Sequence, residues 1–200
     1  MDVTVVIATF GAGTWIVLAD RAKASVPAGI PIIHVHDLTL HEARNTGLAE
    51  VQTEWVCHLD ADDELTPGYF DVMEAGTCDL RAPAVSYINT GRVHAPGVPR
   101  VAGHHHACTA ACLRDGNWLV IGTVLRAALA RQAGGWRDWP VYEDWDLFQR
   151  CWLAGASVEA IPSAVYRAHM NPESRNRAPP MEFRNAIHHQ IIAANLGLAT

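Results

Sequence analysis

The stretch of sequence that decides the fold is EWVCHLDADDE, residues 54–64. Residues 54–59 predict a strand, and the strand ends at an acidic cluster that contains Asp60 and Asp62. Both carboxylates therefore lie at the carboxyl end of a strand, where open α/β sheets bind their ligands. Clustered acidic residues repel one another unless a cation or hydrogen bonds compensate, and oxygen ligands of this kind suit Mg2+ or Mn2+ together with a diphosphate.

A solvated acidic turn with a helix-capping aspartate would look similar. The strand before the cluster and the pair Thr66-Pro67 after it favour a binding site instead, since proline is tolerated at the first position of a helix.

Outward from this stretch, the chain alternates apolar strands and helical segments. Residues 3–8 form a β-branched run that predicts a strand buried on both faces, as in a parallel sheet. Thr14 is expected to cap the next helix, and residues 30–35 predict a second strand, which completes a βαβ unit. The further expected elements are helices at 42–51, from Thr66, at 126–132, 144–153 and 183–196, and strands at 80–88, 118–125 and 157–161. We therefore expect an α/β fold.

Composition bounds the protein class. The chain has 200 residues, 50% of them hydrophobic, and a net charge of −6, which is ordinary for a globular protein and excludes a disordered or collagen-like chain. Residues 1–80 carry a net charge of −10 and residues 81–200 a net charge of +4, so a cation site suits the first half and an anionic ligand the second. We expect a single domain over 1–200.

The N-terminal uncharged run, residues 3–19, is short of the ~20 apolar residues of a membrane span and is preceded by Asp2 rather than a basic residue. We expect no signal peptide and no membrane insertion. The five cysteines form no CxxC pair, which favours reduced thiols and a cytoplasmic location. The oligomeric state stays open.

Two further segments carry candidate chemistry. Residues 89–116 are rich in Gly, Pro and His and predict a long loop or hairpin, which is often functional in a compact domain. Glu143 and Asp144 stand at a predicted helix start. A carboxylate there can simply cap the helix or act as a general base, and the two roles are compatible.

Taken in order, five motifs resemble family 2 glycosyltransferases of the GT-A fold, over residues 3–175. They are the opening strand 3–10, the ARN-x-G helix at 43–47, the strand and D-x-D loop at 55–63, the segment GGW at 134–136 followed by EDWDL at 143–147, and the segment at 166–169. The resemblance implies a Rossmann-like nucleotide-binding sheet flanked by helices, with a nucleotide-sugar half at 1–88 and an acceptor half with a small extension and tail at 89–200.

The resemblance also implies roles for particular residues. Thr9 and Phe10 would line the base pocket together with Asp37, and Arg44 would help to hold the diphosphate. Asp60 would contact the sugar or ribose, Asp62 would bind Mn2+ or Mg2+, and His169 would complete the metal shell. Asp144 would be the catalytic base, with Glu143 and Trp145 on the acceptor side.

The chain departs from the family pattern at two places. Ala8-Thr9-Phe10 stands where the family usually has Pro-Thr-Tyr, and the acidic-Gly-Ser-Thr stretch is replaced by residues 37–40. Both departures bear on which nucleotide base is bound.

Rival readings rest on weaker patterns. Gly11 and Gly13 after a strand resemble a dinucleotide fingerprint, but Ile16 stands at the third glycine position. His104–His106 with Cys108 and Cys112 have the residue types of a zinc site. Adjacent histidines in a loop rarely all face one ion, which disfavours zinc but leaves it open. A net charge of −6 argues against non-specific nucleic-acid binding, though not against a local basic patch.

The leading hypothesis is an inverting, metal-dependent glycosyltransferase that uses a nucleotide-sugar donor, UDP-linked by resemblance. The acceptor would be a saccharide, a small molecule, a protein or a hydroxylated base in DNA. The alternative is a non-catalytic sugar-nucleotide or nucleic-acid binding module on the same fold. A module of that kind needs no base, so the presence of Asp144 beside Asp62 favours the enzyme.

Overall fold

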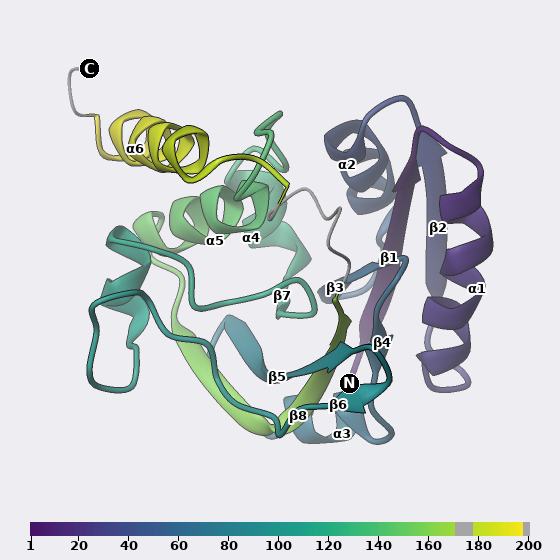
Figure 1. Cartoon of the computed structure of the whole chain (residues 1–200). Coiled ribbons are helices and arrows are strands. Elements are labelled where there is room, and N and C mark those ends of the chain that lie inside the picture. Colours follow the sequence, from purple (N-terminus) through teal and green to yellow (C-terminus); the bar gives the residue numbers. More distant parts are fainter. Residues whose placement is uncertain (171–177, 198–200) are drawn as a thin grey trace.

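A single mixed sheet organises the computed structural model, which describes residues 1–170 and 178–197 (Figure 1). The strand order is β2-β1-β3-β7-β5-β8-β4, and β6 pairs with β5. The strands are β1 (Val3–Phe10), β2 (Ile32–Asp37), β3 (Trp55–Asp60), β4 (Glu64–Leu65), β5 (Leu80–Asn89), β6 (Arg92–Val93), β7 (Val124–Arg126) and β8 (Val158–His169). The helices are α1 (Thr14–Ser25), α2 (Leu40–Glu50), α3 (Tyr69–Glu74), the 3-10 turn η1 (Ala110–Arg114), α4 (Ala127–Gln132), α5 (Glu143–Leu153) and α6 (Met181–Leu196).

The N-terminal half is the expected βαβ core. β1 pairs in parallel with β2 on one side and β3 on the other. Its residues from Val3 to Thr9 are all buried because α1 and α2 lie on opposite sides of these strands in Figure 1. Gly47 lets α2 approach closely, since a Cβ at this position would stand 2.4 Å from Val6 Cγ1. This contact explains the glycine of the ARN-x-G motif.

The sheet departs from a purely parallel one at β7. This short strand runs antiparallel to both β3 and β5 and joins the two halves of the sheet. β5 and β8 then pair in parallel over almost their full length, with a register shift after Pro83. The expected α/β class with one helix-flanked sheet is confirmed, although the sheet is mixed.

Three element boundaries predicted from sequence are wrong. Gly13, not Thr14, caps α1. The helix expected at Thr66-Pro67 begins at Tyr69 after Gly68, whose φ is +74°, because the Thr66 hydroxyl donates to Val165 O of β8 instead. The strand expected at 118–125 is reduced to Val124–Arg126, since Gly122 turns the chain with φ +100°.

The C-terminal half packs helices against one another as well as against the sheet. α5 contacts η1, α4 and α6, and α6 lies across the outer side of α5 in Figure 1. The loop or hairpin expected at 89–116 is present, with β6 folding back on β5 and η1 near its end. β8 is longer than the strand expected at 157–161. Part of the tail expected as a loop, residues 171–177, lies outside the described residues.

Among the helices in the described part of the chain, none has both the length and the apolar character needed to cross a membrane.

Candidate active site

The carboxyl ends of β1, β2 and β3 gather the first set of candidate residues. Ala8 stands opposite Asp60, and Phe10 stands opposite Asp37, in the parallel registers of the sheet. Phe10, Asp37 and Asp60 therefore lie along one sheet edge, as strands that end together require.

Arg44 links this edge to the second half of the chain. Its guanidinium donates to Asp60 Oδ1 at 2.9 Å and to Glu143 Oε1 at 2.7 Å, and its side chain is 2% exposed. Burial alone would lower the pKa of Arg44, but the two carboxylates outweigh it and raise the pKa above its usual value. Glu143 begins α5, so one buried cation joins the D-x-D strand to the start of that helix.

The other face of Arg44 is covered by an aromatic side chain. The guanidinium carbon lies 4.3 Å from the centre of the Trp136 ring, a cation–π contact. The Trp136 indole N–H donates to His58 Nε2 at 3.2 Å. Burial, and then the charge of Arg44, lower the pKa of His58 well below its usual value, so the ring is neutral and accepts this bond.

The ARN and GGW motifs bind each other directly. The Asn45 amide accepts the backbone N–H of Trp136 at 2.8 Å and donates to its carbonyl oxygen at 2.8 Å. Gly135 has a φ of +67°, and a Cβ there would stand 2.4 Å from Asn45 Oδ1. Only glycine fits this approach, which gives a physical reason for its place in the motif.

Asp144 lies in the first turn of α5, half-buried. Its carboxylate accepts the Trp145 backbone N–H at 2.8 Å and the Asn117 side-chain N–H at 3.0 Å. Burial, and then the neighbouring Glu143, raise the pKa of Asp144 to about 7. Desolvation at this position therefore opposes the helix dipole, which favours the ionised carboxylate at a helix start.

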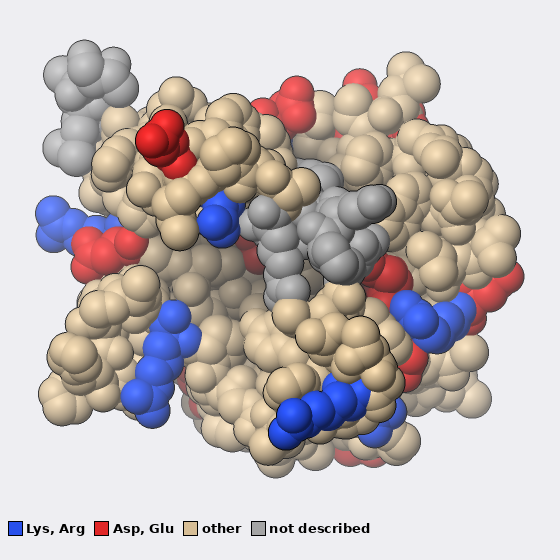
Figure 2. All heavy atoms as spheres, in the orientation of Figure 1, with Lys and Arg blue, Asp and Glu red and all other residues tan. Residues whose placement is uncertain are grey.

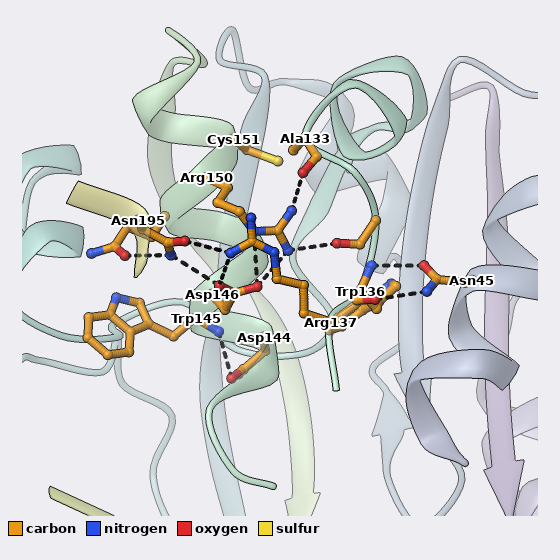
Figure 3. A network of polar contacts seen from close by, with 12 residues as sticks. Asn45, Ala133, Trp136, Arg137, Asp144, Trp145, Asp146, Arg150, Cys151 and Asn195 are labelled. Carbon is orange, nitrogen blue, oxygen red and sulfur yellow. Dashed lines mark hydrogen bonds and ion pairs between the residues drawn. The ribbon is translucent and has the colours of Figure 1, made fainter. Parts of the chain in front are cut away.

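A buried ion pair that begins two residues further along fixes the position of α5. Asp146 is 0% exposed and accepts two hydrogen bonds from Arg150, at 2.6 and 3.0 Å. Arg150 also donates to the carbonyl oxygens of Ala133 and Gly135, so it ties the helix to the GGW turn (Figure 3). Asn195 of α6 donates to Asp146 Oδ1 at 3.1 Å from the other side. The second aspartate of the EDWDL motif thus anchors the helix that carries Asp144.

The acidic loop after β3 is only partly neutralised. Asp63 is buried and accepts the Tyr166 hydroxyl at 2.6 Å and the His169 backbone N–H at 2.7 Å. The His169 ring pairs with Glu64 at 3.0 Å rather than with Asp62. Burial, and then Asp60, raise the pKa of Asp62 to about 6.

The acidic loop fits a divalent cation. Among residues 1–170 and 178–197, no side chain donates a hydrogen bond to the Asp62 carboxylate. Asp62 supplies carboxylate oxygens, and Asp60, although paired with Arg44, supplies a second carboxylate on the same loop; oxygen donors of this kind are the ligands of Mg2+ or Mn2+.

A pocket of about 210 Å3 adjoins the Arg44 bridge. It lies between the segment after β2 and the loop before α5. Its lining residues are Phe10, Leu38, Thr39, Leu40, His41, Arg137, Asp138, Trp139, Pro140 and Glu143. Half of these residues come from each half of the chain, so the pocket exists only in the folded protein.

Three residues named from the resemblance lie in surroundings that differ from the expected ones. Thr9 is 1% exposed, and its hydroxyl is hydrogen-bonded among His34, His36 and the Val35 carbonyl, so it lies beneath the edge rather than on it. Arg44 is buried and donates to two carboxylates instead of lying open on the sheet edge.

Trp145 is the third of these residues. It is 1% exposed, its indole N–H donates to Leu113 O at 2.8 Å, and its ring stacks on His188. The indole thus belongs to the packing of α5 against η1 and α6, with no surface on which an acceptor could rest.

The residue that sequence reasoning missed is Asn117. It binds Asp144, and it also accepts the Leu119 backbone N–H at 3.0 Å, which fixes its orientation. No motif marks it, because it stands 27 residues from Asp144 at the end of the long loop. The sequence marks it only by position, because Asn117 lies between the loop expected at 89–116 and the strand expected to begin at Trp118.

Comparisons with known proteins agree with this architecture. The family model of glycosyl transferase family 2 matches residues 12–95. The chain has no significant match among curated protein sequences.

Solved structures give long matches at low identity. The Staphylococcus aureus TarS 1–349 complex with UDP-GlcNAc matches with a TM-score of 0.65 and 14% identity, covering 98% of this chain and 66% of that one. The UDP complex of the same protein gives 0.66 and 15%, with 98% and 65% covered. This chain therefore spans just under two thirds of those chains, and at this identity the likeness establishes the shared fold.

Proposed function

We propose that this chain, whose residues 12–95 match the model of glycosyl transferase family 2, transfers a sugar from a nucleotide-sugar donor to an acceptor hydroxyl, with inversion at the anomeric carbon. The observation that carries the proposal is the Arg44 bridge. It holds Asp60, at the end of β3, and Glu143, at the start of α5, on a single guanidinium. The D-x-D loop and Asp144 are thereby fixed relative to each other before any ligand binds.

On this proposal the donor lies along the edge formed by β1, β2 and β3. Phe10 and Asp37 would contact the base and ribose, with Thr9 supporting them from below, and Asp60 would contact the sugar or ribose. Mg2+ or Mn2+ on Asp62, with His169 near it, would offset the charge that grows on the leaving diphosphate.

Asp144 acts as the base. Its carboxylate takes the proton of the acceptor hydroxyl while the hydroxyl oxygen attacks the anomeric carbon and the bond to the nucleoside diphosphate breaks. A pKa of about 7 suits this task, because the group is substantially ionised at neutral pH and still basic enough to accept a proton. Arg44 is a positioning residue, since it pairs with Asp60 and Glu143 and not with Asp144.

We place the acceptor on the side of the pocket formed by residues 137–140 and Glu143, across from Phe10, which contacts the donor. Trp139 and Pro140 offer apolar and aromatic surface, while Asp138 and Arg137 offer polar groups, a combination suited to a sugar or a base. On the face shown in Figure 2, Lys and Arg side chains are scattered and form no continuous basic stripe.

A donor panel tests the proposal. Binding of nucleotide sugars, beginning with UDP-GlcNAc because the similar TarS structure contains it, is measured with Mn2+ and with EDTA, and slow donor hydrolysis is followed in parallel. We expect metal-dependent binding and hydrolysis of at least one donor. Donor binding with no hydrolysis and no transfer to any saccharide or DNA acceptor would instead support the non-catalytic module.

A further inference from the structure

We propose that His104, Cys108 and Cys112 form a zinc site that pins the long loop to helix α5. The ligand atoms of these three side chains all lie within 4.8 Å of one another. His104 and Cys108 are partly exposed and Cys112 is buried, so an ion can enter from solvent. Nothing in the proposed glycosyl transfer uses these residues.

The distances match a tetrahedral ion. With Zn–S bonds of about 2.3 Å and Zn–N bonds of about 2.0 Å, tetrahedral geometry places sulfur and nitrogen ligands about 3.5 Å apart. Cys112 Sγ and His104 Nδ1 are 3.5 Å apart. Two thiols and one imidazole are ligands that zinc prefers over Mg2+ or Mn2+.

The surroundings of the ligands also fit a metal–thiolate site. Each sulfur accepts a backbone N–H, Cys108 from Val101 at 3.4 Å and Cys112 from Thr109 at 3.3 Å. Such bonds stabilise thiolate charge. The other ring nitrogen of His104, Nε2, faces Asp115 Oδ2 at 4.0 Å, the arrangement by which a carboxylate orients a ligating histidine.

The sequence-based objection was that three adjacent histidines do not all face one ion. The structure removes it, because only His104 joins the cluster, while His105 and His106 are exposed. The ligands then follow the spacing His-x3-Cys-x3-Cys. The fold brings them together through the turn at residues 101–104 and the 3-10 turn η1, which carries Cys112.

Metal binding is expected to fix the position of Asp144, the proposed base, through the contacts of η1. Leu113, next to Cys112, accepts hydrogen bonds from Trp145 and Gln149 of α5 at 2.8 and 2.9 Å. Asn117 follows η1 by three residues and donates a hydrogen bond to the Asp144 carboxylate. An ion that fixes η1 therefore also fixes Asn117, the hydrogen-bond partner of Asp144. Binding releases the thiol protons to solvent, so zinc affinity should rise with pH.

The test measures metal rather than transfer, so it stands apart from the proposed function. The chain is purified without a histidine tag, and bound zinc is counted by elemental analysis. The apoprotein is then titrated with Co2+ and followed by its thiolate charge-transfer absorption. We expect one zinc per chain, and a tetrahedral cobalt spectrum that zinc abolishes.

Matched variants identify the ligands. Cys108→Ser and Cys112→Ser should each lose the charge-transfer band in part and bind zinc at least tenfold more weakly, and the double variant should lose the metal. Cys78→Ser, His105→Ala and Asp62→Ala should retain it. Asp115→Asn should weaken binding by about tenfold, as removal of a group that orients a ligand does.

Three outcomes would overturn the proposal. They are wild-type protein with no zinc and no cobalt–thiolate band, zinc retained by the Cys108→Ser/Cys112→Ser double variant, and a Cys108–Cys112 disulfide found by mass spectrometry of the freshly alkylated chain. Loss of zinc in His105→Ala would likewise contradict the assigned ligand set.

Discussion

Protonation of Asp144 is expected to control activity across neutral pH. Because its pKa is raised to about 7, about one tenth of the chains carry the ionised form at pH 6 and about one hundredth at pH 5. With the base required in its ionised form, kcat/KM should rise with pH and level off above pH 7, lying about tenfold below the plateau at pH 6. The assay is transfer or donor hydrolysis between pH 5 and 8.5 at saturating Mn2+, which keeps Asp62 ionised and removes it from the profile.

Two variants, with one control, test whether the pH profile reports the protonation of Asp144. Asp144→Asn should lower kcat at pH 8 by at least about 100-fold, the usual effect of removing a general base, while donor affinity is kept. Asn117→Ala removes a hydrogen bond that favours the ionised carboxylate, so its profile should shift to higher pH by up to about one unit. Asp20→Asn makes the same chemical change on the exposed face of α1 and should leave both parameters unchanged.

The same pKa fixes the sign of a stability effect. A carboxyl group whose pKa is raised by folding binds its proton more tightly in the native state, so native stability falls as pH rises from the ordinary carboxyl range to about 7. Asp144→Asn removes this loss and should unfold at the same or a higher urea concentration than wild type at pH 8. A flat pH profile, or near-normal turnover by Asp144→Asn, would refute the reasoning and leave Asp144 with a structural role only.

Three other changes test the framework around the site. Arg44→Met should lower the free energy of unfolding by about 3 kcal/mol, measured by urea titration, because it leaves the Glu143 carboxylate buried without its cation; an unchanged midpoint would contradict the bridge. Asp62→Ala should keep the circular dichroism spectrum but lose the Mn2+-dependent part of nucleotide-sugar binding in calorimetry, so equal affinity with Mn2+ and EDTA in both proteins would count against a metal there. Gly135→Ala should cost about 2 kcal/mol or more, because its φ is +67° and a Cβ would collide with Asn45; Gly97→Ala, which meets no atom, is the control.

The sequence by itself determined the architecture wherever local patterns are strong. The apolar runs at 3–8 and 54–59 predict buried strands, which the structure has as β1 and β3, and the acidic loop that follows β3 lies at the sheet edge. Helix ends were less predictable. Thr66 prefers a backbone partner in β8 to capping a helix, and that partner is 99 residues away.

Only the tertiary structure decided how the motifs work together. Arg44 pairs with Asp60 and Glu143, which lie 16 and 99 residues away, because a buried guanidinium without such partners would be strongly destabilising. Whether Asp144 is ionised depends on how much water the fold removes, which no local pattern reports. The contact between the His104 and Cys112 side chains depends on two turns, at residues 101–104 and at η1, that place distant parts of the loop side by side. These properties arise from contacts between distant residues, whereas the sequence states only which residues are available to make them.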